Sequence, residues 1–130
     1  MGGGETVDQK KERPIHWIGS SRQDLRDFPD DARRDIGLAL FFAQRGEKHS
    51  SAKPLKGFKG AGVLEIVEDD RGDTYRAVYA VRFAEAIYVL HAFKKKSKSG
   101  IKTPRHELDL IERRLKAAEL DYQQWLKGKK

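Results

Sequence analysis

Lysine and arginine side chains are concentrated in three segments of this sequence, in an arrangement suited to binding and cleaving a phosphate ester. They are Lys53, Lys56 and Lys59 in a loop over residues 46–62, Arg76 and Arg82 on a predicted strand, and Lys94, Lys95, Lys96 and Lys98 after the next strand. Because the strands are consecutive, we expect these cations to lie near one another. Such a patch can neutralise phosphate groups.

The chemistry available to this patch is phosphodiester cleavage in RNA without a metal. An arginine held on a strand can stabilise the extra negative charge of a pentacoordinate phosphorane, while a nearby lysine, tyrosine or histidine moves protons. The 2′-hydroxyl of RNA is an internal nucleophile, so holding it in line with the adjacent phosphate supplies much of the catalysis. His91, just before the last lysine run, is a candidate proton donor.

Each of these residues also has a purely structural interpretation. Arg76 and Arg82 can pair with Glu65 or Glu68 across the sheet. The lysine-rich tract can be a solvated loop. His91 can be a hydrogen-bonded strand histidine, and the residue pattern alone leaves both interpretations open.

Composition narrows the class of protein. The chain has 130 residues, with 38% hydrophobic and 36% charged residues, which fits one small domain with a heavily charged exterior. Lysine plus arginine exceed aspartate plus glutamate by 27 − 20 = +7. This balance favours a polyanionic partner, with nucleic acid as the leading class.

Several kinds of site are excluded by residue type or spacing. Cysteine is absent, and the four histidines lack metal-ligand spacing, so we expect no metal site. The glycine-rich run 57–62 has the wrong spacing for a nucleotide fingerprint and precedes a strand, so we expect no cofactor. No apolar run reaches the roughly 18–20 residues of a membrane span, and we expect a soluble, cytoplasmic protein without membrane contacts.

Hydrophobic spacing predicts an α+β domain over residues 14–126, between a flexible arm at 1–13 and a basic tail at 127–130. The predicted elements are a strand over 15–18, two helices between Ser21 and Ala43, three meander strands over 63–67, 75–83 and 86–93, and a helix from Thr103-Pro104 to Leu126. Ser20 or Ser21 is the expected cap of the first helix, and Gly46 the stop of the second. Period-2 alternation puts Tyr75 on a buried face and Arg76 on a cationic face.

The order of these elements and three motifs resemble a known family. The motifs are Tyr75-Arg76-Ala77-Val78-Tyr79, Tyr88 to Ser97 with its Leu-His-Ala-Phe-Lys-Lys-Lys core, and Lys102-Thr103-Pro104. Residues 14–118 are similar to the RelE/ParE toxin superfamily, specifically its HigB-like, phage-derived branch. The resemblance implies a RelE-like small domain with a strand and helical hairpin packed on an antiparallel sheet of about four strands, and a C-terminal helix.

The resemblance also implies an activity. It indicates a type II toxin that cleaves translated mRNA at the ribosome and is neutralised by a helix-turn-helix antitoxin in a hetero-oligomer. Arg76 matches the family's phosphate-stabilising strand arginine. We therefore expect Arg76, Lys56, Lys95 and His91 to be catalytic. Lys53, Lys59, Arg82, Lys94, Lys96 and Lys98 are expected to bind RNA or the ribosome.

One departure from the family pattern keeps two alternatives open. Many relatives carry Glu-Leu-Arg near the end of the first meander strand, whereas this chain has Glu65-Ile66-Val67. One phosphate contact is missing as a result. The alternatives are a ParE-like toxin that poisons gyrase and an inactive nucleic-acid-binding regulator.

Overall fold

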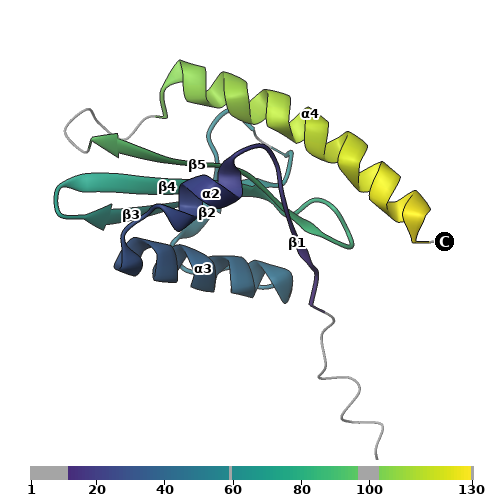
Figure 1. Ribbon diagram of the computed structural model, residues 1–130, viewed down its shortest axis with the longest axis horizontal. Coiled ribbons are helices and arrows are strands. Elements are labelled where there is room, and N and C mark those ends of the chain that lie inside the picture. Colours follow the sequence, from purple (N-terminus) through teal and green to yellow (C-terminus); the bar gives the residue numbers. More distant parts are fainter. Residues whose placement is uncertain (1–11, 59, 97–102, 130) are drawn as a thin grey trace, which may run out of the picture.

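The computed structural model describes residues 12–58, 60–96 and 103–129, which form a five-stranded sheet with helices on both faces (Figure 1). The elements are β1 (Ile15–Trp17), α2 (Ser21–Arg26), α3 (Asp30–Gln44), β2 (Ala52–Pro54), β3 (Val63–Asp70), β4 (Asp73–Ala80), β5 (Ile87–Lys96) and α4 (Arg105–Gly128). The predicted α+β class is confirmed.

The sheet has the strand order β1-β5-β4-β3-β2. The three long strands form the predicted antiparallel meander, with β5 in a central position between β4 and β1. Two short strands extend it beyond the expected count. β1 pairs in parallel with β5, while β2, from the segment predicted as a loop, pairs antiparallel with β3.

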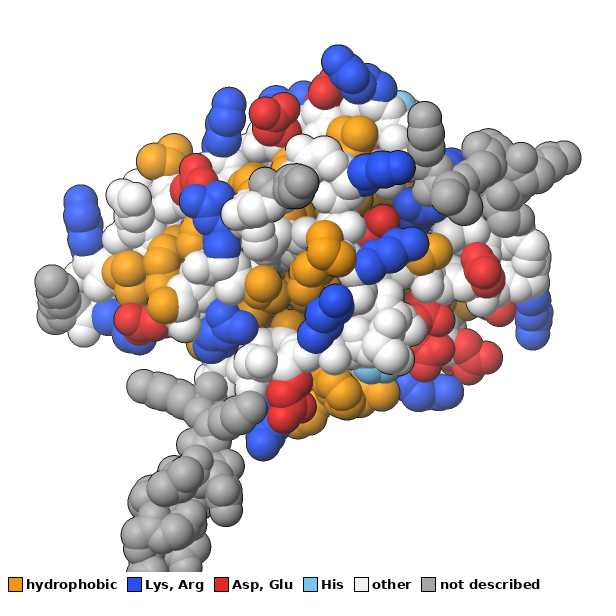
Figure 2. Space-filling model, turned by 180° about the vertical axis from the view of Figure 1, so that it is seen from behind, with side chains coloured by type: hydrophobic (Ala, Val, Ile, Leu, Met, Phe, Trp, Pro, Cys, Tyr) orange, Lys and Arg blue, Asp and Glu red, His pale blue; other side chains and the backbone are white. Residues whose placement is uncertain are grey.

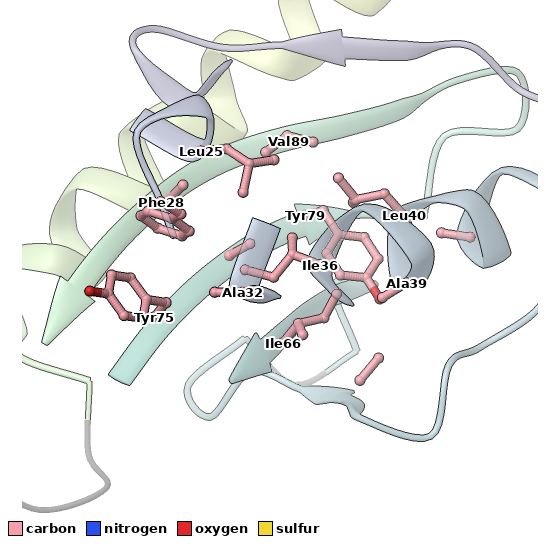
Figure 3. Packing of buried hydrophobic residues seen from close by; sticks show 14 of the residues in the cluster. Leu25, Phe28, Ala32, Ile36, Ala39, Leu40, Ile66, Tyr75, Tyr79 and Val89 are labelled. Atoms are coloured by element: carbon pink, nitrogen blue, oxygen red, sulfur yellow. The ribbon is translucent and has the colours of Figure 1, made fainter. Parts of the chain in front are cut away.

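One face of the sheet is covered by α2 and α3. The spacing of Ala32, Ile36 and Leu40 makes one side of α3 apolar, and these residues pack against Ile66 and Tyr79 of the sheet (Figure 3). Acidic residues occupy the first turn of α3, where they interact favourably with the helix dipole. Gly46 follows the end of this helix with a positive φ of 78°, as a helix stop requires.

The opposite face of the sheet is covered by α4 (Figure 1). Ile111, Leu115 and Ala118 of this helix are buried against the side of the sheet that includes Val78 and Leu90. Arg76 lies on this side, as the alternation predicts, but the side is buried as well, because the apolar stripe of α4 packs against it. Within the described ranges no helix, α4 included, is long and apolar enough to cross a membrane.

Several element boundaries differ from the predicted ones. β4 spans Asp73–Ala80 instead of 75–83, because the turn consists of only Arg71 and Gly72, both with positive φ (52° and 88°). β5 continues to Lys96 instead of ending at residue 93. α4 begins after Pro104, not after Thr103, and ends at Gly128 instead of Leu126, so it includes the start of the predicted basic tail. Ser20 occupies the expected N-cap position of α2 without a capping hydrogen bond.

Arg13 ties the start of the described chain to the domain. Its guanidinium donates hydrogen bonds to the carbonyl oxygens of Val81 (3.1 Å), Phe83 (2.8 Å) and Ala43 (2.9 Å). The Gln44 side chain donates to the Arg13 carbonyl oxygen at 2.7 Å. Arg13 therefore belongs to the folded domain, although the sequence assigned it to the arm; residues 1–11 of that arm lie outside the described residues.

Candidate active site

The side chains best able to bind phosphate or transfer protons lie on the face of the sheet that α4 covers. The strand register aligns Lys53 with Glu65, Glu65 with Val78, and Val78 with His91, which makes one row across four strands. Directly opposed residues project from the same face, and so do residues two apart on a strand. Arg76 therefore shares this face in the next row, between Val67 and Phe93, and Lys95 lies one row further, opposite Thr74.

Arg76 is bound within the protein. Its side chain is almost fully buried, and its Nη1 donates hydrogen bonds to Glu65 Oε1 at 3.2 Å and to Thr103 Oγ1 at 3.0 Å. The structural interpretation of Arg76, a pair with Glu65, is thus confirmed. A buried pair of opposite charges restrains both side chains, since removing one partner leaves a desolvated charge.

Lys95 lies close enough to this pair to interact electrostatically with it. Its side chain is buried, with 9% relative exposure, and the register places it opposite Thr74. Burial lowers the pKa of Lys95, the positive charge of Arg76 lowers it further, and the Glu65 carboxylate partly opposes the change. A lysine with a lowered pKa exchanges protons more readily at neutral pH than an ordinary surface lysine.

A β-bulge turns His91 onto the same face. The register passes from Val78–His91 to Tyr79–Val89, so Leu90 is the extra residue on β5. His91 Nε2 lies 2.6 Å from Glu107 Oε1, and Arg114 Nη1 lies 3.4 Å from His91 Nδ1. Since arginine only donates, Nδ1 is the acceptor and Nε2 carries the proton donated to Glu107. This geometry favours the interpretation of His91 as a hydrogen-bonded strand histidine.

The other predicted cations are dispersed. Lys53 is exposed and points to the α4 face from the edge strand β2, and Lys56 is exposed in the loop that follows. Lys94 points to the opposite face and pairs with Asp73 at 3.3 Å. Arg82 lies beyond the end of β4 and pairs with Glu119 of α4 at 3.0 Å, so it does not join Arg76.

Three predicted binding residues are not placed. Lys59 and Lys98 lie outside the described residues, and of Lys96 only the backbone, which pairs with Asp73, is described. Seen from behind in Figure 2, the described lysine and arginine side chains are spread over the surface with aspartate and glutamate among them. The cations in that view form a dispersed pattern instead of one continuous basic patch.

Sequence reasoning missed the contribution of α4 to the site. Thr103, two residues before α4, accepts the hydrogen bond from Arg76, while Glu107 and Arg114 of the helix contact His91. Arg114 also donates to the carbonyl oxygen of Leu90 at 3.0 Å, which fixes the bulge. The spacing of Glu107 and Arg114, two turns apart on one helix, was the available signal.

Comparison with known proteins places the chain in a family. The model of the family described as Phage derived protein Gp49-like (DUF891) matches residues 23–116, well over half of the chain. The chain belongs to this family. The Gp49-like family is a RelE/HigB-type toxin family, which confirms the resemblance indicated by the sequence motifs. No curated protein matches the sequence.

Two solved structures are similar to this Gp49-like chain. A doubly substituted E. coli toxin RelE in the free state is 14% identical, with a TM-score of 0.49 over 68% of this chain and 87% of that chain. The toxin–antitoxin complex RelBE2 from Mycobacterium tuberculosis contains a chain that is 20% identical, with a TM-score of 0.44 over 68% of this chain and 97% of that chain.

Proposed function

We propose that this Gp49-like protein is the toxin of a type II toxin–antitoxin pair and cleaves translated mRNA at the ribosome without a metal. Membership of a RelE/HigB-type toxin family supports the class. The observation that carries the activity is the placement of Arg76 and Lys95 on neighbouring strands and on one face, with the pKa of Lys95 lowered by burial and by Arg76.

The proposed reaction is attack of a 2′-hydroxyl on the adjacent phosphate. The 2′-oxygen forms a bond to phosphorus, the bond to the 5′-oxygen breaks, and the products are a 2′,3′-cyclic phosphate and a 5′-hydroxyl. Arg76 stabilises the charge that develops on the phosphate oxygens. A phosphate oxygen reaching Arg76 takes the place of the Thr103 hydroxyl, the neutral acceptor beside Glu65.

Proton transfer is assigned to two lysines. Lys95, whose pKa is lowered, donates a proton to the leaving 5′-oxygen, a role better suited to it than to His91, because both ring nitrogens of His91 already face protein groups. Lys56, in the exposed loop, assists removal of the 2′-hydroxyl proton, which passes to solvent. Lys53, on the same face, binds the RNA backbone.

A helix-turn-helix antitoxin is the proposed partner in the cell. It would silence the toxin by covering the α4 face with an acidic or amphipathic segment, which excludes RNA and complements the charge of Lys53 and Lys56. Its test is co-purification of the toxin with the product of the neighbouring gene, together with relief of growth arrest when both are expressed.

One observation favours a second candidate, a nucleic-acid-binding regulator without activity. Val67 stands where relatives carry an arginine, and the register places it directly opposite Arg76. The site therefore has an apolar side chain beside its main cation. The mark of this candidate is salt-sensitive RNA binding without cleavage.

The test is induced expression in bacteria with mapping of new mRNA 5′ ends on translated and untranslated transcripts. Lys95→Met keeps the length of the side chain and removes the ammonium group, so we expect loss of cleavage in folded protein. Lys94→Met is the matched control, because the ammonium group of Lys94 lies on the opposite face of the sheet from that of Lys95.

Three results contradict the proposal in different ways. Cleavage that persists with Lys95→Met removes Lys95 from the mechanism. Growth arrest with DNA damage and no new RNA ends favours gyrase poisoning. Folded wild-type protein that neither arrests growth nor cuts RNA favours the inactive regulator.

A further inference from the structure

A groove lies between Gly57, Phe58 and Ala61 on one side and one flank of α4 on the other. Its volume is about 520 Å³, which is typical of small-molecule sites. Gly57 and Gly60 have positive φ values of 93° and 78°, and the backbone N–H groups of Phe58 and Ala61 donate to the carbonyl oxygens of Leu55 and Phe58. The glycines that match no nucleotide fingerprint thus shape one wall of a groove on the same side of the sheet as the candidate active site.

The lining of this groove suits a flat, uncharged ring. Phe58 is half-buried, and Leu108 and Leu115 of α4 provide apolar surface across from it. The charged residues along the α4 flank are two basic and three acidic ones, so no excess of positive charge lines the groove: they are Arg105, Lys116, Asp109, Glu112 and Glu119. A phosphate group gains little in such a place, whereas a nucleobase can stack on Phe58 and bond to a carboxylate.

Two of the three groove carboxylates already have cationic neighbours. Glu119 pairs with Arg82 at 3.0 Å, and Asp109 lies 3.9 Å from Arg105. Glu112, one turn from Asp109 and two turns from Glu119, has neither an ion pair nor a side-chain hydrogen bond within the described part of the chain. It is the carboxylate best placed to accept hydrogen bonds from a ligand.

The chemistry of a carboxylate selects among the bases. Its two oxygens accept two parallel N–H donors, as they do from arginine. Guanine presents such a pair on its Watson–Crick edge, the N1–H and the 2-amino group. Adenine, cytosine and uracil each lack this pair of adjacent donors.

We propose that this groove binds a guanine base of the RNA substrate, stacked on Phe58 and hydrogen-bonded through its N1–H and 2-amino groups to Glu112. The proposal rests on the proposed function for its substrate class, RNA. The groove lies next to the site, because Gly57 in its wall directly follows Lys56, which the proposed function places at the 2′-hydroxyl. The base bound there is thus that of a nucleotide near the cleaved bond.

The test is titration of the full-length protein with GMP, IMP and AMP, followed by NMR chemical shifts of the backbone amides. The three nucleotides share a phosphate, so differences among them come from the base. IMP keeps the N1–H of GMP and lacks the 2-amino group. We expect GMP to bind about tenfold more tightly than AMP, with IMP between them, and shifts centred on residues 57–61 and 108–116.

Variants localise the effect. Glu112→Gln is expected to weaken GMP binding about tenfold with little change for AMP. Glu119→Gln is the matched control in the same groove, where Arg82 holds the carboxylate, and is expected to bind GMP like the wild type. Phe58→Leu keeps an apolar side chain and is expected to weaken all three nucleotides. Thermal melts confirm that each variant is folded.

Equal affinity for GMP and AMP, or GMP binding that survives Glu112→Gln, overturns the proposal. Shifts confined to β4 and β5 around Arg76 and Lys95 indicate a phosphate site alone, and they overturn the proposal as well. So does a protein segment that fills the groove while nucleotides leave it unchanged. These outcomes are separate from failure of the proposed function, because nucleotide binding is measured without cleavage. If cleavage occurs, guanine enrichment near the cuts is expected to disappear with Glu112→Gln.

Discussion

Removing one member of the buried Glu65–Arg76 pair is expected to destabilise the protein strongly and asymmetrically. The side chains of this pair have relative exposures of only 9% and 5%, so an unpaired charge left there remains desolvated. With Arg76→Met, the Glu65 carboxylate still has Lys95 nearby as a counter-charge. With Glu65→Leu, Arg76 and Lys95 are left as two cations on neighbouring strands with no carboxylate between them.

The magnitudes follow from this arrangement. Breaking a buried pair costs about 3–5 kcal/mol, and we expect Arg76→Met near the lower value and Glu65→Leu near the higher one. An unfolding entropy of about 2.1 cal/mol/K per residue makes 1 kcal/mol worth about 4 °C in Tm, so the Tm values should fall by about 12 and 20 °C. The double variant Glu65→Leu with Arg76→Met replaces the pair by apolar groups and should recover most of the loss.

Urea unfolding of all four proteins gives the double-mutant cycle. We expect a coupling free energy of at least about 2 kcal/mol. A coupling near zero, or an Arg76→Met variant that is less stable than Glu65→Leu, refutes the reasoning from the buried charges. The cycle also supplies folded proteins without Arg76, in which loss of cleavage is separable from loss of structure.

Three further predictions concern the frame around the site. Arg13→Met removes three charged hydrogen bonds and should lower the free energy of unfolding by about 2–4 kcal/mol. Arg34→Met, at an exposed position, should change it by less than about 0.5 kcal/mol. Urea unfolding compares the two variants, and equal losses contradict a stabilising role of the Arg13 hydrogen bonds. Gly62→Ala should be more destabilising than Gly57→Ala. Both glycines have positive φ, but only at Gly62 would the new Cβ lie 2.9 Å from another side chain, that of Arg82. Tm values in the reverse order contradict this explanation. Burial, and then nearby carboxylates, raise the pKa of Glu68, so the native protein holds a proton on Glu68 at pH values where the unfolded chain has lost it. The free energy of unfolding should therefore fall as pH rises from 4.5 through the native pKa, and Glu68→Gln should flatten this fall in urea midpoints measured between pH 4 and 7. A pH curve of Glu68→Gln parallel to that of the wild type contradicts the assignment.

The helices and the central meander were predictable from local spacing. The apolar residues of α3 recur at helical steps, and the alternation around Tyr75 and Arg76 placed them correctly on opposite faces of β4. The same alternation puts Lys94 and Lys95 on opposite faces of β5, although they belong to one basic run in the sequence. A period of two thus carries more information about a lysine run on a strand than its net charge does.

The contacts at the site were less predictable, because they depend on pairing between distant segments. The residue types around Leu90 and His91 do not predict the bulge that turns His91 toward α4. The sequence also left open which face of the sheet α4 covers, and therefore that Thr103 would reach Arg76. Arg82 lies outside β4 because the strand ends at Ala80, where its pairing with Val63, the first residue of β3, also ends.

The parallel pairing of β1 with β5 has a consequence for the order in which the domain forms during synthesis. His16 and Tyr88 are 72 residues apart in the chain, so β1 leaves the ribosome long before its partner strand exists. The β3–β4 and β4–β5 hairpins are local and close early, whereas closure of β1 onto β5 carries the larger entropic cost. The α4 residues that complete the site are translated after all five strands. The nascent protein is thus expected to pass through a stage in which its central sheet is assembled while its first strand and last helix are still undocked.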